Sequence, residues 1–284
     1  MANKKAIISV WDKTGIVELA SFLHNEKYEI ISTGGTAREI ENAGIPVTKV
    51  SNLTKQNEIM DGRVKTLHPN IFGGILVDRN NENHMKDLNE MNSLPIDLVV
   101  INLYPFQEEA INKKLDIEKS IEFIDIGGPS ILRAAAKNFK FVIPLCSPEQ
   151  YSDFMKSYKK NNGSFADECR IKYARRVFKL TSEYDLLIAD YFNDNNSDEL
   201  KMSYIKNATL RYGENPHQNA SFYLEKNKNL IWNQLHGKQL SYNNYFDIES
   251  AINIVFEFGG YSCSIIKHSN PCGFSTGDSP LESY

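Results

Sequence analysis

The stretch Ala6-Ile7-Ile8-Ser9-Val10-Trp11-Asp12-Lys13-Thr14-Gly15 passes from a short apolar run into a polar turn. The run from Ala6 to Val10 predicts a buried strand. After the turn, Ile16 to Glu26 predicts a helix whose apolar residues, Leu19 and Leu23 among them, share one side. Strand, polar turn and helix in this order form the first half of a βαβ unit, in which neighbouring strands run parallel.

The same order repeats along the first two-thirds of the chain, which predicts an α/β sandwich with a mainly parallel sheet. A second strand is expected at Tyr28 to Ser32, followed by a tight loop at 33–36 and a helix at 37–43 that ends at Gly44. Further predicted strands are 47–50, 71–77, 97–103 and 141–146, and further predicted helices are 129–138, one that Pro148 opens, and 164–192.

A chain of 284 residues has room for two domains. The polar stretch Asn193 to Glu199 has no apolar period, so it is the predicted linker. We therefore expect a first domain at 1–195 and a second unit at 200–284. The second unit has strand patterns at 221–224 and 263–267, and we expect it to be the beginning of a larger domain.

The composition of the chain excludes several classes of protein. Hydrophobic residues make up 41% and charged residues 24%, and the net charge is −4. A broad nucleic-acid surface needs clustered excess base, so none is expected. No apolar run reaches the roughly 18 residues of a membrane span, and the first apolar run is too short for a secretory leader. The four cysteines show no CxxC spacing, which favours free thiols and a cytoplasmic protein.

Two glycine-containing loops are candidate phosphate sites. Thr33-Gly34-Gly35-Thr36 and Asp12-Lys13-Thr14-Gly15 each follow a predicted strand and precede a helix. Backbone N–H groups and a helix N-terminus at such a place favour an anion. Loops after neighbouring parallel strands would meet in one crevice. A plain turn after the strand and a solvated Lys13 are the alternative interpretation.

The segment Gly62-Arg63-Val64-Lys65-Thr66-Leu67-His68-Pro69 places two cations close together. In an extended segment Arg63 and Lys65 would face the same side, where they repel each other unless an anion lies between them. A surface ion pair is the alternative. The residue before Pro69 is restrained to extended geometry, so His68 is as readily structural as catalytic.

Two further groups lie at predicted strand or helix ends. Asn102 and Tyr104 follow an apolar strand, where they are placed to contact a ligand or to pack beneath a loop. Asp125 precedes a Gly-Gly-Pro turn, and Lys137 follows on the next helix, on the face of Arg133. If that face lines the crevice, Lys137 meets a carboxylate or a substrate oxygen there. A structural ion pair is the alternative.

The second unit carries two candidate segments. Arg211-Tyr212-Gly213-Glu214-Asn215-Pro216-His217-Gln218 is rich in polar side chains, Gly and Pro, which indicates a binding loop. Lys267-His268 follows an apolar strand, and a neighbouring cation favours a neutral His268 that can act as a base. His268 and Cys272 are too few ligands for a zinc site, so we expect no metal.

In their order and spacing, these segments resemble the bifunctional AICAR transformylase/IMP cyclohydrolase family, and the resemblance covers essentially the whole chain. The motifs that carry it are Asp12-Lys13-Thr14-Gly15, Ser32 to Thr36, Gly62 to Pro69, Asn102 to Phe106, Ile124 to Gly128, Arg133 to Asn138, Leu210 to Gln218 and Lys267-His268. One departure is Trp11, where the family often has Ser.

The resemblance implies a methylglyoxal-synthase-like cyclohydrolase domain, the start of a cytidine-deaminase-like transformylase, and a homodimer. The transformylase moves a formyl group from 10-formyltetrahydrofolate to AICAR (5-aminoimidazole-4-carboxamide ribonucleotide), and the cyclohydrolase closes formyl-AICAR to IMP with loss of water. The implied ligands are these ribotides and folate. No bound cofactor is expected for the cyclohydrolase. Family members continue well beyond residue 284, so we expect negligible formyl transfer from residues 1–284 alone.

Roles follow from the resemblance. For ring closure, Asp125 is the expected proton acceptor, Lys137 the proton donor, Lys65 the oxyanion partner and Tyr104 the positioning group. For formyl transfer, His268 is the expected base and Lys267 its partner. The implied substrate contacts are Asp12, Lys13, Thr14, Thr33, Gly34, Gly35, Thr36, Arg63, Val64, Thr66, Asn102, Ile126, Arg211, Tyr212 and His217.

Two other functions remain open. The same fold also serves as a non-catalytic regulatory module that binds phosphate or nucleotide, and such a module has no need of Lys65, Tyr104, Asp125 and Lys137. A lyase that acts on another phosphate ester, as methylglyoxal synthase does, is the second rival. The segment from Arg211 to His268 argues against that lyase.

Overall fold

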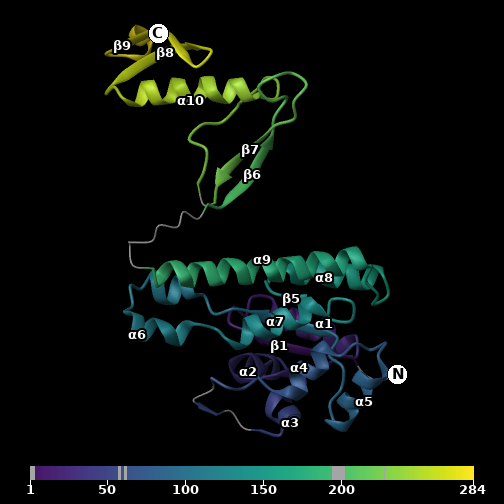
Figure 1. Cartoon of the computed structure of the whole chain (residues 1–284). Helices are drawn as coiled ribbons and strands as arrows, with labels where there is room; N and C mark the ends of the chain where they lie inside the picture. Colours follow the sequence, from purple (N-terminus) through teal and green to yellow (C-terminus); the bar gives the residue numbers. More distant parts are fainter. Residues whose placement is uncertain (1–3, 57–58, 61–62, 194–201, 227) are drawn as a thin grey trace. The chain divides into compact units, whose positions relative to one another are not determined.

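The structure is a computed structural model that describes residues 4–56, 59–60, 63–193, 202–226 and 228–284 (Figure 1). The chain divides into two compact units, Met1–Asn196 and Ser197–Tyr284. The predicted linker, Asn193 to Glu199, lies outside the described residues except for Asn193. The assignment of the two units to two enzyme domains with boundaries at 195 and 200 stays a prediction.

The first unit alternates strands and helices. Its elements are β1 (Lys5–Val10), α1 (Ile16–Asn25), β2 (Glu29–Ser32), α2 (Gly34–Asn42), β3 (Thr48–Lys49), α3 (Val50–Thr54), α4 (Pro69–Leu76), α5 (Glu82–Glu90), β4 (Leu98–Asn102), the π-helix η2 (Gln107–Ile111), α6 (Ile117–Ser120), the 3₁₀-helix η3 (Ile121–Phe123), α7 (Gly127–Lys137), β5 (Ile143–Leu145), α8 (Glu149–Lys160) and α9 (Asp167–Tyr191). Within the described residues, no helix is both long enough and apolar enough for a bilayer.

The five strands form one parallel sheet in the order β3-β2-β1-β4-β5, which confirms the predicted α/β fold. β1 supplies both faces of the sheet because successive side chains of a strand point to opposite sides. Ala6, Ile8 and Val10 pack with α1 and α8, whereas Ile7 packs with α4 and α7.

The prediction of a strand at 71–77 is wrong, because these residues belong to the helix α4. Pro69 is its first residue, and the imidazole Nδ1 of His68 caps it by accepting the N–H of Asn70 at 3.1 Å. Ile71 and Ile75 are fully buried against the sheet. A short apolar run does not by itself distinguish a buried strand from a buried helix. The capping role favours the structural interpretation of His68.

Two helices begin earlier than predicted. α2 begins at Gly34 and not at Ala37, so the predicted loop forms the first helical turn. α7 begins at Gly127 and not at Pro129. Both shifts bring glycine N–H groups into a first turn, where the helix leaves them without an intrahelical partner. The two helices therefore present backbone donors at their N-termini.

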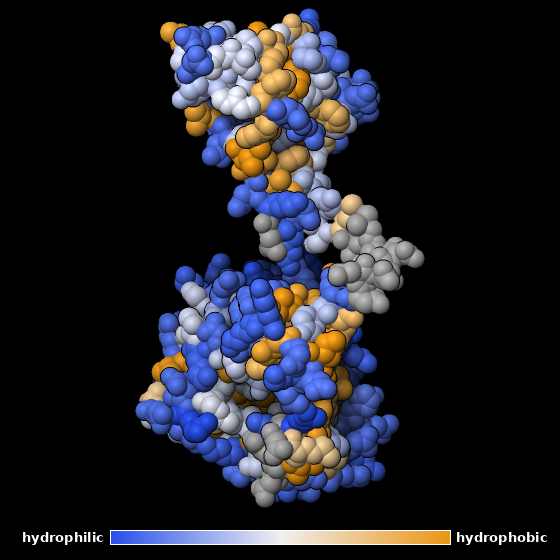
Figure 2. All heavy atoms as spheres, turned by 90° about the vertical axis from the view of Figure 1, so that its left-hand side faces the viewer, coloured by the Kyte–Doolittle hydropathy of each residue, from blue (hydrophilic) through white to orange (hydrophobic). Residues whose placement is uncertain are grey.

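The second unit contains two antiparallel hairpins and one long helix. Its elements are β6 (Tyr204–Thr209), β7 (Ser221–Glu225), α10 (Tyr242–Phe256), β8 (Tyr261–Lys267), β9 (Asn270–Gly277) and α11 (Pro280–Ser283). Large apolar side chains such as Phe256 and Leu281 are exposed on it. Hydrophobic patches are visible on this unit in the upper part of Figure 2. The unit thus buries little of its own apolar surface.

Candidate active site

A cavity of about 660 Å³ opens at the carboxyl ends of strands of the parallel sheet. Loops after three strands and the N-termini of two helices surround it. Its lining residues are Ser9, Val10, Trp11, Lys13, Thr33, Gly34, Gly35, Thr36, Arg63, Lys65, Thr66, Ile101, Asn102, Tyr104, Ile121, Glu122, Ile124, Asp125, Ile126, Gly127, Gly128 and Ile131. Most of the predicted site residues of the first unit are therefore brought together in one hollow.

The topology of the sheet explains this location. β1 pairs with β2 on one side and with β4 on the other, and the chain crosses over between these halves. The carboxyl ends of strands at such a switch point form the usual ligand crevice of open α/β sheets. The side chain of Asn102 connects the end of β4 to the loop after β1. Its Oδ1 accepts the N–H groups of Trp11 and Asp12, and its Nδ2 donates to the carbonyl of Asp12 at 2.8 Å.

The cavity wall at α2 combines a cation with backbone donors. Lys13 lies beside the first turn of α2, where a Cβ built on Gly35 would be 3.9 Å from its Nζ. The first-turn N–H groups and the positive end of the helix dipole both favour an anion. Thr36 is structural here, since its buried hydroxyl pairs with the backbone of Val10. Lys13, Gly34 and Gly35 thus form a site with the chemistry of a phosphate cradle.

The segment after β3 and α3 brings two more cations to the opposite wall. Arg63, Lys65 and Thr66 line the cavity, and a Cβ built on Gly127 would lie 3.1 Å from Thr66 Oγ1. The two sequence motifs around residues 65 and 126 therefore meet in space. The guanidinium of Arg63 forms an ion pair with the carboxylate of Glu122, and both side chains are exposed. The ion pair predicted as the alternative for Arg63 is thus present.

Asp125 lies at the entrance to α7. Its Oδ1 accepts the N–H of Gly128 at 2.8 Å, and its own N–H is held by the hydroxyl of Tyr184 at 2.8 Å. Burial raises the pKa of the Asp125 carboxyl above its ordinary value, although hydrogen bonds from the N–H groups of Gly128 and Tyr104 oppose the rise. A carboxylate with a raised pKa is a better proton acceptor, which is the property that a general base needs.

Tyr104 and Trp11 form an aromatic wall of the cavity. Their ring centroids are 5.0 Å apart with an interplanar angle of 79°, an edge-to-face arrangement. Both rings remain partly exposed, at 40% for Tyr104 and 44% for Trp11. A planar heteroaromatic ligand can pack on such rings. Trp11, at which the sequence departs from the family pattern, therefore lies in the cavity itself.

Lys137 is not among the residues that line this cavity, so its meeting with Asp125 there stays a prediction. α7 begins at the cavity and ends at Lys137. At 1.5 Å per residue, Lys137 lies about 15 Å along the axis from Gly127. Arg133, on the same exposed face, stacks over the ring of Phe178 at 5.5 Å. Helical spacing identified the shared face but not its distance from the cavity.

Three predicted substrate contacts also lie off the cavity wall: Asp12, Thr14 and Val64. The carboxylate of Asp12 accepts the N–H of Thr14 at 2.9 Å. Hydrogen bonds from the side chain of Thr14 and from this N–H hold the pKa of Asp12 below its ordinary value. Val64 pairs with the backbone of Ile59. These residues shape the loops that carry Lys13 and Arg63.

Of the candidate residues of the second unit, Tyr212 is half-buried, and Arg211, His217, Lys267 and His268 are exposed. The guanidinium of Arg211 donates to the hydroxyl of Tyr212 at 3.1 Å, and Tyr212 is joined to α10 through its carbonyl and the N–H of Tyr242. Lys267 ends β8, and His268 and Ser269 form the hairpin turn, both with positive φ. His217 is exposed on the loop after Arg211.

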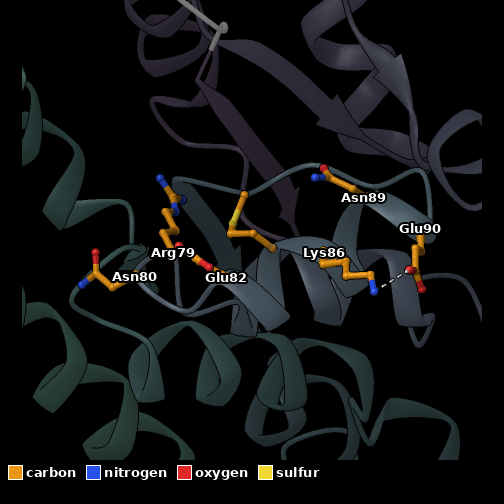
Figure 3. Close-up of a pocket in the computed structure, with 7 residues that line it drawn as sticks. Arg79, Asn80, Glu82, Lys86, Asn89 and Glu90 are labelled. Carbon is orange, nitrogen blue, oxygen red and sulfur yellow. Dashed lines mark ion pairs between the residues drawn. The ribbon is translucent and has the colours of Figure 1, made fainter.

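A second hollow lies along α5 and contains mostly charged and amide side chains, some of which form ion pairs. Arg79 forms an ion pair with Asp97 at 2.8 Å and donates to the carbonyl of Ile96. Lys86 lies 3.9 Å from Glu90, the contact drawn as a dashed line in Figure 3. The lining residues are Arg79, Asn80, Glu82, Met85, Lys86, Asn89 and Glu90. Because both of its lysine and arginine side chains are already in ion pairs, this hollow is a weaker candidate than the cavity at the carboxyl ends of the strands.

Sequence reasoning missed some cavity residues. Glu122 belongs to a short 3₁₀-helix without a recognisable motif, so no signal marked it. Gly127 and Gly128 belonged to a quoted motif, and their close contacts with Thr66 and Asp125 show why Gly is needed there. Among the described residues, no group of three or more His, Cys, Asp or Glu side chains could hold a metal ion.

Comparison with protein families gives two matches that together span most of the chain. Residues 15–130 match the family described as MGS-like domain, and residues 135–284 match the family described as AICARFT/IMPCHase bienzyme. The first match includes β2, β3 and β4 and agrees with the predicted methylglyoxal-synthase-like fold. The second covers the end of the first unit and the whole second unit.

Curated relatives and a solved structure agree with these matches. Proteins named "Bifunctional purine biosynthesis protein PurH" from Caldicellulosiruptor saccharolyticus, Persephonella marina and Bacillus cereus are 48%, 45% and 45% identical to the chain, over 99% of its length. The chain spans 57%, 56% and 57% of their lengths, respectively. The crystal structure of ForH superposes with a TM-score of 0.60 at 33% identity, over 66% of this chain and 96% of that one.

Proposed function

The chain belongs to the AICARFT/IMPCHase bienzyme family, and from this premise we propose that its first unit closes formyl-AICAR to IMP with loss of water. One observation carries the proposal. A single cavity contains a candidate base, Asp125, an aromatic wall with Tyr104, and the three cations Lys13, Arg63 and Lys65. These groups match a substrate that combines a planar ring, a phosphate and an amide that must lose a proton.

The ribotide phosphate is proposed to bind at the first turn of α2. Lys13 contributes charge there, and Thr33, Gly34 and Gly35 contribute backbone or hydroxyl donors. With the phosphate at this end, the ring would extend past Asn102 toward Tyr104 and Trp11, which line the same cavity. The reacting groups would then lie near the α7 entrance, where Asp125, Ile126 and Thr66 meet.

In the proposed mechanism, the carboxamide nitrogen attacks the carbon of the formyl group on the same imidazole. Asp125 accepts the amide proton as the new N–C bond forms, and Lys65 stabilises the charge that develops on the formyl oxygen. This oxygen takes up two protons, one lost by the carboxamide nitrogen and one by the formylated 5-amino nitrogen. It leaves as water when the C–O bond breaks and the C=N bond of the new ring forms. Both reacting groups belong to one molecule, so the cavity mainly selects the planar conformer in which they meet. The reaction changes no oxidation state, and we propose no bound cofactor for it.

The position of Lys137 constrains its proposed role. Lys137 is the last residue of α7, about 9 Å along the helix axis beyond Ile131, and it does not line the cavity of its own chain. If Lys137 acts in ring closure, as the resemblance implies, a second copy must supply it, which agrees with the proposed homodimer. Mixing inactive Asp125→Asn and Lys137→Ala chains tests this. Recovered turnover supports supply by a second copy, and no recovery from folded, mixed chains rules out that supply.

The second unit is proposed to contribute part of the formyl-transfer site. His268 would act as the base for the AICAR amine, Lys267 as its partner, and Arg211, Tyr212 and His217 as substrate contacts. 10-Formyltetrahydrofolate would be the cosubstrate. The geometry that supports this is local: the amide of Ser269 beside His268 is held by Asp247 on α10, the helix whose start joins Tyr212. A cytoplasmic location is proposed with this metabolic role.

An absorbance assay with synthetic formyl-AICAR tests the proposed function. We expect the purified chain to convert it to IMP well above the uncatalysed rate. Tight IMP binding without turnover would favour the regulatory module instead. Conversion of dihydroxyacetone phosphate to methylglyoxal would favour the lyase. Asp125→Asn is the matched control, since it preserves the size of the side chain and removes its charge.

A further inference from the structure

The cavity wall that carries Asp125 has little regular structure of its own. It consists of α6 with four residues, η3 with three, and the turn that enters α7. Short segments of this kind make few internal hydrogen bonds. The position of the wall therefore depends on side chains that reach it from other elements, and helix α9 supplies two of them.

We propose that Tyr184 of α9 is a positioning residue for Asp125, and that its hydroxyl fixes the bend from Phe123 to Asp125 that aims the carboxylate into the cavity. The inference rests on the proposed function and adds a residue that does not line the cavity. The hydroxyl of Tyr184 donates to the carbonyl of Phe123 at 3.3 Å and accepts the N–H of Asp125 at 2.8 Å. A phenol can make both bonds at once.

The location of this hydroxyl is set by the core. The ring of Tyr184 is buried in a small cluster with Phe106 and Ala110, against which Phe123 and Ile124 also pack. Burial raises the pKa of Tyr184 to about 12, so the hydroxyl keeps its proton at neutral pH and remains a donor. Because the ring cannot swing without disturbing this cluster, the hydroxyl is a fixed reference point for the wall.

Asp125 is then held at both ends. Tyr184 holds its backbone, and the N–H of Gly128 holds its carboxylate at 2.8 Å. Loss of the Tyr184 hydroxyl leaves the carboxylate of Asp125 hydrogen-bonded to Gly128, but the bend from Phe123 to Asp125 is no longer held. Small displacements of a reacting group are costly, because catalysis depends on the distance and alignment of that group.

Tyr191 provides a matched control on the same helix. It lies seven residues further along α9, about two turns, so it shares the face of Tyr184. Its hydroxyl donates to the carbonyl of Leu115 at 2.6 Å and pairs with the hydroxyl of Ser120 at 2.7 Å. Tyr191 therefore holds the same wall by the same kind of contact, but at its far end from Asp125.

The test compares Tyr184→Phe with Tyr191→Phe in the full 284-residue chain. Each variant keeps its ring and loses one hydroxyl, so similar losses of thermal stability are expected. For Tyr184→Phe we expect kcat for formyl-AICAR cyclisation to fall about tenfold or more, because a displaced base costs transition-state stabilisation. KM should change less than about twofold, since the phosphate contacts are untouched. For Tyr191→Phe both constants should stay within about twofold of the wild type.

Equal losses of kcat in the two variants, or an unchanged kcat in Tyr184→Phe, would overturn the inference. Amide hydrogen exchange of the peptide that spans residues 123–126 gives a second readout. We expect faster exchange in Tyr184→Phe than in Tyr191→Phe, because only the first removes the acceptor of the Asp125 N–H. An inactive wild-type chain would overturn the proposed function instead. The exchange comparison would then decide the inference alone, and equal exchange in both variants would end it.

Discussion

The carboxylate of Asp125 lies directly against Gly128, whose N–H it accepts at 2.8 Å. A Cβ built on Gly128 would be 2.4 Å from Oδ2 of Asp125 and 2.9 Å from the side chain of Leu103. Real Cβ atoms do not approach other atoms so closely, so any side chain at position 128 must displace the carboxylate or the start of α7. The proposed base and the first turn of α7 therefore form one rigid unit.

Gly128→Ala is expected to lower kcat for formyl-AICAR cyclisation by about a hundredfold. The added methyl group must displace the Asp125 carboxylate, and catalysis is sensitive to small displacements of a reacting group. Steady-state kinetics measure this loss. Gly259→Ala is the control, since a Cβ there meets nothing within 4 Å. Wild-type kcat in a folded Gly128→Ala protein would contradict the assignment of Asp125 as the base.

The raised pKa of Asp125 predicts opposite effects on activity and stability. Burial is the main cause of the rise, so the folded protein favours the neutral carboxyl more than the unfolded chain does. The stability that the carboxyl of Asp125 contributes is present below its pKa in the unfolded chain. It is lost as the pH rises through the pKa of Asp125 in the folded protein. Asp125→Asn is thus expected to raise the melting temperature at pH 7 while it lowers kcat by about a hundredfold or more.

The gain in melting temperature for Asp125→Asn should shrink as the pH falls, because the wild-type carboxyl then also becomes neutral. Thermal unfolding between pH 4 and pH 7 measures the trend, and Asp153→Asn, at an exposed ion pair with Lys172, is the control. A variant that is less stable than the wild type at pH 7 would show that the hydrogen bonds to the charged form outweigh its burial.

Sequence patterns predicted the sheet because its strands carry strong local signals. β1 and β4 are apolar runs of strand length. Asn102 is the last residue of β4, and the loops after the two strands contain Lys13 and Tyr104. Strand-end polarity therefore located most of the cavity. The run at α4 failed because a buried helix and a buried strand look alike over so few residues.

The positions of other residues relative to the cavity depend on distances in space, which the periodicity of a sequence does not give. Lys137 shares a helix face with Arg133, but only the direction of α7 shows that the cavity lies at its opposite end. Tyr184 is far from Asp125 in sequence and reads as one more apolar position of a long helix. Such residues become visible only when the packing of α9 on the wall is known.

The proposed phosphate cradle predicts a loss of binding in Lys13→Met. Removal of one cation beside the first turn of α2 should raise the Kd for IMP by about tenfold, a typical value for one charge-assisted contact. The difference in Kd between wild type and Lys13→Met should be smaller at high salt, because salt ions screen the attraction between Lys13 and the phosphate in the wild type. Isothermal titration at two salt concentrations measures both effects.

Lys86→Met is the matched control for Lys13→Met, since it removes a lysine from the hollow along α5 instead. We expect its Kd for IMP to equal that of the wild type. If Lys86→Met weakened binding and Lys13→Met did not, the phosphate would belong to the hollow of Figure 3. Equal binding by all three proteins would remove both lysines from ribotide recognition.

Trp11 predicts an optical signal for occupancy of the cavity. The chain has two tryptophans, Trp11 and Trp232, and only Trp11 lines the cavity. A ligand ring that packs beside Trp11 replaces water at an indole that is 44% exposed, so the emission of Trp232→Phe should shift to shorter wavelength or lose intensity on addition of IMP. Trp11→Phe should show no saturable change, because its remaining indole lies in the other unit. If the saturable change followed Trp232 instead, the ribotide would bind in the second unit first. A dissociation constant from Trp11 emission that rises about tenfold in Lys13→Met would place the proposed phosphate cradle and the aromatic wall in one binding site.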